Sequence, residues 1–92
     1  MPDISGTITT GNTAQVLCAA DPARQTVFIG NPDPTNDLWV AVLGLTAAAN
    51  AQGSIRVPAN GGGIFITRPD PAQTAFSIVG ATTGQKFTAW TD

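Results

Sequence analysis

Apolar residues occur along the chain in short runs, and turn-forming residues separate one run from the next. In residues 24–31, Val27 and Ile29 fall on one face and Thr26 and Phe28 on the other. This two-residue period is typical of a strand with one buried face. We expect eight such strands, over residues 4–10, 14–20, 24–31, 38–45, 54–57, 64–67, 75–79 and 85–91.

Two segments depart from simple alternation of apolar and polar residues. Residues 38–45 are apolar on both faces, which indicates a central strand that is covered on both sides. Residues 46–52 are rich in alanine, but the segment is short and lies between Gly44 and Gly53. We therefore expect a turn or loop there rather than a helix.

Short strands at a spacing of about ten residues, separated by turns, are typical of an all-β sandwich or a small barrel. We predict one domain over residues 1–92, a single antiparallel β-sandwich for which the jelly roll is one strand order. Residues 1–12 form either the first strand or an N-terminal arm, because Gly11 and Asn12 separate them from the rest. Such an arm could add a strand to the sheet of a neighbour.

The composition excludes much chemistry, because the 92 residues contain no His, no Glu and no Tyr. Catalytic triads that need His, metal sites with His ligands and acid–base pairs with Glu are excluded, so we expect no enzyme and no cofactor. The four cations are scattered along the chain: Arg24, Arg56, Arg68 and Lys86. With a net charge of −2, they provide no basic patch for nucleic acid.

We also expect no membrane span and no secretory signal. No apolar stretch approaches the ~20 residues that a transmembrane helix needs. The start at Met1, Pro2 and Asp3 has neither a basic nor an apolar signal region. The single cysteine, Cys18, lies in an apolar run without a His to activate it, and we interpret it as structural.

The polar residues in the predicted turns could either bind Ca²⁺ or stabilise the turns themselves. Asn31, Asp33, Asn36 and Asp37 place four oxygen-bearing side chains within seven residues, as a Ca²⁺ site would. Their spacing matches no EF-hand loop, and Asp is common in Pro-rich turns because it bonds to nearby backbone N–H groups. We favour the turn role and expect no metal. Residues 61–63 are all Gly and predict a hairpin turn, since no Walker lysine follows them.

The tryptophans leave more than one function open. Trp39 and Trp90 each lie opposite in parity to the expected core residues of their strands. Each could belong to a second core, an oligomer interface or a platform on which a sugar stacks. If the aromatic residues share an outward face, they form an exposed apolar patch, which usually marks a protein contact. The candidate interface residues are Ile4, Ile8, Phe28, Trp39, Phe65 and Trp90.

The order of short motifs over residues 24–91 resembles a known family. The motifs are Arg24-x-x-Val27-x-Ile29-x-Asn31, Asp37-Leu38-Trp39-Val40, Ile55-x-Val57-Pro58-x-Asn60-Gly61-Gly62, Ala75-Phe76-Ser77-Ile78-Val79-Gly80 and Gly84-Gln85-x-Phe87-x-Ala89-Trp90. This order is similar to the small β-sandwich accessory proteins of tailed bacteriophage particles. The resemblance implies a non-enzymatic virion protein, assembled in the host cytoplasm.

Within that family, we expect a capsid decoration (cement) protein. It would bind the major capsid protein on the outer capsid surface as a homo-oligomer, commonly a trimer. The alternative is a tail or fibre module that binds a host-surface glycan through Trp39 or Trp90.

Overall fold

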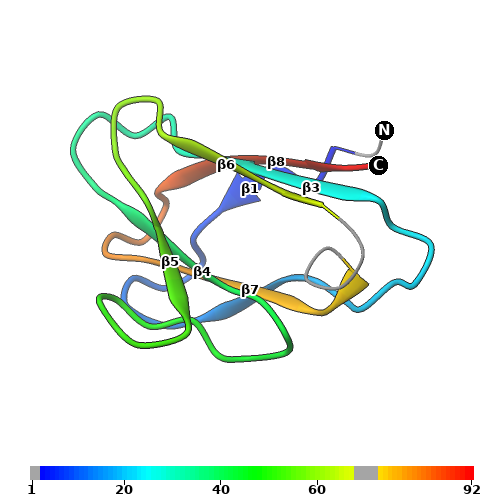
Figure 1. Cartoon of the computed structure of the whole chain (residues 1–92). Coiled ribbons are helices and arrows are strands. Elements are labelled where there is room, and N and C mark those ends of the chain that lie inside the picture. The colour runs from blue at the N-terminus through cyan, green and yellow to red at the C-terminus, as the bar shows by residue number, and fades with distance from the viewer. Residues whose placement is uncertain (1–2, 68–72) are drawn as a thin grey trace.

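The computed structural model describes residues 3–67 and 73–92, so the cation Arg68 lies outside the described residues. The described chain is all-β and forms two four-stranded antiparallel sheets that pack face to face (Figure 1). The strands are β1 (Gly6–Thr7), β2 (Gln15–Cys18), β3 (Thr26–Gly30), β4 (Leu38–Ala41), β5 (Ser54–Val57), β6 (Gly63–Thr67), β7 (Phe76–Gly80) and β8 (Lys86–Thr91). The predicted antiparallel sandwich is confirmed.

The strand order is that of a jelly roll. One sheet has the order β1-β8-β3-β6 and the other the order β2-β7-β4-β5. Most connections cross from one sheet to the other, whereas β4 and β5 are neighbours within one sheet. Eight strands wound through two sheets in this way make the double Greek key of jelly rolls.

The core lies between the two sheets and follows the predicted alternation. Val27 and Ile29 are fully buried, whereas Phe28 between them points outward. The buried core cluster consists of Ile8, Val27, Ile29, Leu38, Val40, Val57, Phe76, Ile78, Phe87 and Ala89. Burying such side chains supplies most of the driving force for folding.

A second, smaller apolar cluster covers the outer face of the sheet β2-β7-β4-β5. It consists of Ala41, Ala47 and Val79, with Ala14 and Trp39 packed against them. Ser77 fixes the covering loop, because its Oγ accepts a hydrogen bond from the Ala47 N–H at 2.6 Å and donates to the Leu45 carbonyl at 3.0 Å. Strand β4 is therefore covered on both sides, as its pattern predicted.

Five of the eight described strands are shorter than the sequence pattern indicates, and two of them have lost half of their predicted length or more. The predicted strand 38–45 ends at Ala41, and Leu43 follows in a left-handed conformation with φ of 61° that turns the chain. The predicted strand 4–10 is reduced to β1, extended by an isolated bridge between Asp3 and Trp90. Residues 3–8 thus run along β8 of their own chain. The alanine-rich segment 46–52 forms turns and loops, as expected.

Two buried amides join the sheets at one end of the sandwich, which we call the loop end. Asn31, at the end of β3, donates from Nδ2 to the carbonyls of Asn36 and Val57 at 2.8 and 3.1 Å. Gln85, just before β8, donates from Nε2 to the carbonyls of Asn36 and Asp37 at 3.1 and 3.3 Å. Both side chains are almost completely buried. The loops at this end are therefore held to both sheets.

The two ends of the described chain lie together at the opposite end of the sandwich (Figure 1). Asp3 pairs with Trp90, two residues before the last residue of the chain. Asp92 in turn donates its N–H to the Thr26 carbonyl at 2.9 Å and accepts from the Gln25 N–H at 2.7 Å. The last strand is thus bonded on both sides up to its end.

Candidate functional site

The outer face of the sheet β1-β8-β3-β6 carries a cluster of three aromatic rings, which we call the aromatic face. Phe28 on β3 lies directly opposite Phe65 on β6 and Trp90 on β8. The ring of Phe28 lies 4.8 Å from that of Phe65 and stacks on that of Trp90 at 5.4 Å. Phe65 remains 64% exposed. Side chains of this size rarely face water so openly without a partner.

Two paired glycines allow Phe28 to lie close to the sheet. Gly30 and Gly63 face each other across β3 and β6. A Cβ atom on either glycine would come within 3.0 Å of the Phe28 ring. The ring therefore covers backbone that a larger residue would fill, as aromatic residues do when they shield glycines in sheets. This packing fixes the centre of the aromatic face.

The surroundings of the aromatic face are small and almost uncharged. Its other outward-facing residues on the described strands are Thr7, Thr26, Gly30, Gly63, Thr67, Lys86 and Thr88. Lys86 is the one charged side chain in this set, and it lies away from the three rings, opposite Thr7. A second charge lies just outside the strands, at Asp3, which pairs with Trp90. The face thus has an apolar centre and a polar rim, the anatomy of a protein interface.

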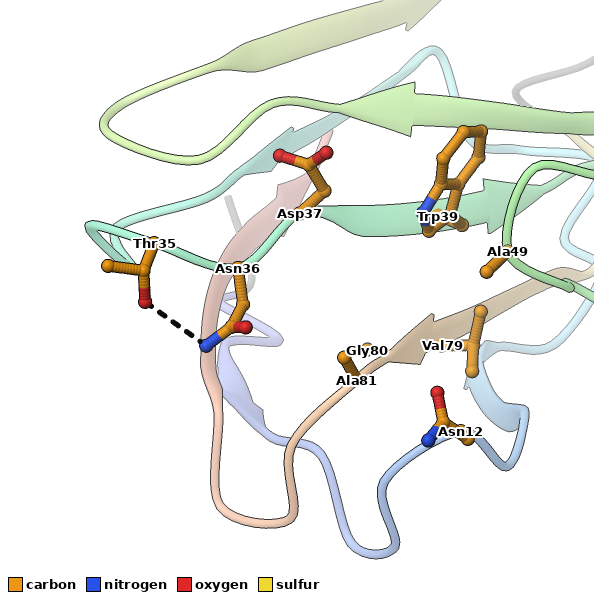
Figure 2. Close-up of a pocket in the computed structure, with 9 residues that line it drawn as sticks. All are labelled: Asn12, Thr35, Asn36, Asp37, Trp39, Ala49, Val79, Gly80 and Ala81. Carbon is orange, nitrogen blue, oxygen red and sulfur yellow. Dashed lines mark hydrogen bonds between the residues drawn. The ribbon is translucent and has the colours of Figure 1, made fainter.

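A second candidate site is a cavity of about 220 Å³ at the loop end, which we call the loop-end pocket. Four segments distant in sequence form it: the loop after β1, the approach to β4, the loop that covers β4, and the end of β7. The residues that line it are Asn12, Thr35, Asn36, Asp37, Trp39, Ala49, Val79, Gly80 and Ala81 (Figure 2). Its wall is therefore part amide and hydroxyl and part apolar.

The carboxylates near this pocket are already engaged. Asp37 accepts from Arg56 Nε at 2.7 Å and from the Ala59 N–H at 2.8 Å, and these bonds lower the pKa of its carboxyl group. Asp33 Oδ1 accepts the backbone N–H groups of Thr35 and Asn36, which lower its pKa as well. Both groups stay ionised at neutral pH and stabilise turns.

All four residues of the Ca²⁺ alternative have partners within the fold, but the turn interpretation is confirmed for Asp33 and not for Asp37, whose partners are Arg56 and Ala59. Asn31 and Asn36 use their amides within the fold, and Asp33 and Asp37 bind backbone N–H groups. Within residues 3–67 and 73–92, no group of three or more His, Cys, Asp or Glu side chains could hold a metal ion. Asp33 acts as a turn residue, whereas Asn31 and Asp37 join segments that are distant in sequence.

Cys18 is half-buried and packs against the core. Burial raises the pKa of its thiol, although the charge of Arg24 and the N–H of Phe76 partly offset this effect. A thiol with a raised pKa is a poor nucleophile at neutral pH. The geometry agrees with a structural role for Cys18.

Searches against family models, curated proteins and solved structures find no match for this chain. Its function is therefore argued from its own residues. In the described part of the chain, no helix is long and apolar enough to cross a membrane.

The structure brings together only three of the six candidate interface residues. Phe28, Phe65 and Trp90 form the aromatic face. Trp39 lies instead on the outer face of the opposite sheet, so the condition that all four aromatic residues share one face is met by three of them.

The two isoleucines that flank β1 do not lie at the exposed interface that the sequence predicted. Ile8 is 1% exposed and belongs to the core, so it offers no surface to a partner in this conformation. Ile4 is half-buried and packs against the same core. Ile4, Gly6 and Ile8 are spaced two residues apart because they share the inward face of the strand. Alternation in the sequence shows that residues share a face, but it does not show whether that face is the core or an interface.

Asn12 is the pocket residue that sequence reasoning did not single out. The sequence predicts only a turn at Gly11 and Asn12, and Asn12 does adopt a left-handed φ of 61°. Asparagine tolerates this conformation better than most residues, so its side chain can be carried at a sharp turn. The signal for a site appears only when the fold brings Asn12 beside Asn36 and Trp39.

Proposed function

We propose that this protein is a non-enzymatic structural protein that assembles with copies of itself through the aromatic face. The single observation that carries this proposal is the cluster of Phe28, Phe65 and Trp90 on the outer face of one sheet, in which Phe65 is exposed and the other two rings are half-buried. The rings are large and rigid, so they bury much apolar surface at little cost in side-chain entropy. The rim of threonines would exclude water around them.

We further propose that the assembly is a trimer that decorates the outer surface of a bacteriophage capsid and binds the major capsid protein. The motif order of residues 24–91 and the antiparallel β-sandwich, with its jelly-roll strand order, support this proposal. A jelly roll by itself hosts many functions, so the fold alone does not carry the argument. An oligomer would also multiply weak individual contacts to a repeating surface.

The assembly is tested by light scattering of the purified chain at several concentrations. We expect a mass close to three times 9.4 kDa for the wild type. The Phe65→Thr variant removes the most exposed ring and keeps a strand-forming residue, so it should be monomeric at the same concentrations. Val16→Thr is the matched control, because Val16 is 76% exposed on β2 of the other sheet and its loss should leave the trimer intact.

A folded wild-type monomer at every concentration would overturn the assembly. So would a Phe65→Thr protein that remains trimeric. The virion role has a separate test, namely immunogold labelling of phage particles from cells that carry the gene. Label on the heads supports capsid decoration, label on the tails moves the protein to the tail, and unlabelled particles refute the virion role.

A further inference from the structure

Three polar groups that line the loop-end pocket have no hydrogen-bond partner within the described residues. They are the side-chain amide of Asn12, the Oδ1 atom of Asn36 and the indole N–H of Trp39. Figure 2 shows these residues around one opening, with Asn36 and Ala49 on opposite sides and Trp39 and Asn12 on the other two. Together they offer both donors and acceptors to a ligand.

The rest of the pocket wall is apolar. Ala49, Val79 and Ala81 line it together with the carbons of Trp39 (Figure 2). Pockets that bind small molecules combine such apolar surface with a few convergent polar groups. A ligand that fits this wall has C–H groups on its faces and hydroxyl groups around its edge.

The charges around the pocket favour an uncharged ligand. Its lining contains no Lys or Arg, so an anionic ligand would meet no cationic side chain in the pocket wall. Its one carboxylate, Asp37, is already held by Arg56 Nε and the Ala59 N–H, so it is not free for a cation. An ionised ligand would lose its hydration without compensation.

The size of the pocket suits the part of a ligand that is about one small ring. Its volume of about 220 Å³ is below the roughly 300–1,000 Å³ of sites for drug-sized ligands. It equals the space of roughly seven water molecules. A single sugar ring is of this order.

The pocket is held in shape before any ligand arrives. The Asn12 N–H donates to the Gly80 carbonyl at 2.7 Å, and the preceding Gly11 packs so tightly that a Cβ atom would lie 2.6 Å from the Ala81 carbonyl oxygen. On the other side, the Asn36 carbonyl accepts from both Asn31 and Gln85. A preformed site loses little entropy on binding.

We propose that the loop-end pocket binds one ring of a neutral sugar. The amide of Asn12, Oδ1 of Asn36 and the indole N–H of Trp39 bond to its hydroxyl groups, while its C–H face packs on the apolar wall. The site lies on other residues than the aromatic face and does not depend on it.

The test is a nuclear magnetic resonance titration of the ¹⁵N-labelled full chain. The probes are glucose, galactose, mannose and N-acetylglucosamine, with glucuronic acid and sialic acid as charged comparisons. We expect saturable shifts of the Asn12 side-chain amide and the Trp39 indole signal with at least one neutral sugar. The Trp90→Phe variant assigns the Trp39 signal, since the chain has two tryptophans.

The key variant is Asn12→Gly, which removes the amide and keeps the left-handed backbone at φ of 61°. It should weaken binding at least tenfold. Asn60→Gly is the matched control, because Asn60 has a similar φ of 66° and lies outside the pocket. The affinity of this variant for the sugar should equal that of the wild type. The dispersion of the same spectra shows that each variant is folded.

Four results would overturn the proposal: no shift with any neutral sugar, tighter binding of the acidic sugars, unchanged affinity in Asn12→Gly, or shifts centred on Trp90. The last result would move the sugar to the aromatic face. Failure of the trimer does not alter this titration, and failure of the titration leaves the light-scattering result standing, so the two proposals can be refuted separately.

Discussion

Replacing Asn31 with alanine removes three hydrogen bonds at the loop end of the sandwich. Asn31 Nδ2 donates to the carbonyls of Asn36 and Val57, and its Oδ1 accepts from the Asp33 N–H at 3.1 Å. Asn31 is 1% exposed, so water cannot easily replace these bonds. At about 1 kcal/mol each, their loss should lower the free energy of unfolding by about 3 kcal/mol. The total free energy of unfolding of a folded domain is only about 5–15 kcal/mol.

Urea unfolding followed by tryptophan fluorescence measures this loss, and a thermal scan should show Tm falling by roughly 12–24 °C. Asn50→Gly is the control, because Asn50 is exposed with φ of 54° and should change stability by less than about 0.5 kcal/mol. A loss below about 1 kcal/mol in Asn31→Ala, with an unchanged denaturant dependence, would show that Asn31 does not join the sheets as described.

Two further predictions concern the aromatic face and the acidic turns. Gly30→Ala places a Cβ atom 3.0 Å from the Phe28 ring, so it should destabilise the fold by about 1 kcal/mol. It should also weaken the near-ultraviolet circular dichroism of the Phe28–Trp90 stack, and an unchanged spectrum contradicts this packing. The carboxyl pKa values of Asp33 and Asp37 are lowered in the fold, so their stabilisation is present above about pH 4 and is lost at lower pH. The urea concentration at the midpoint of unfolding should therefore decrease as the pH is lowered from 5 to 2. The decrease should be smaller in Asp37→Asn. A midpoint that does not change with pH refutes the stabilising role of these two carboxyl groups.

Alternation in the sequence predicted which residues point inward, because a strand with one buried face repeats every two residues. Val27 and Ile29 are buried while Phe28 faces outward, and Phe87 and Ala89 are buried while Trp90 lies on the other face. The turn role of Asp33 was also predictable, because its bonds join neighbours two or three residues apart. Asp37 differs, because it bonds to Arg56 and Ala59, 19 and 22 residues away. Local rules suffice for the alternation and for the turn at Asp33.

Contacts between distant segments were not predictable in this way. Nothing local distinguishes Trp39 from Trp90, yet the first is covered by the loop that contains Ala47 and the second lies on the aromatic face. Asn31 and Val57 are 26 residues apart, and Gln85 and Asn36 are 49 residues apart. The loop-end pocket likewise exists only after the sheets have packed. These features depend on strand order, which a single sequence does not determine.

The meeting of the two chain ends at one corner of the sandwich fixes how the molecule would be presented when it is tethered. Asp3 pairs with Trp90, so a tether on either end leaves beside the aromatic face. Two loops that line the loop-end pocket, the one after β3 and the one after β7, lie at the end of the sandwich away from the chain ends (Figure 1). A chain anchored by its ends, whether to a support or to another domain, would therefore display the pocket outward, while an attached tag would crowd the aromatic face.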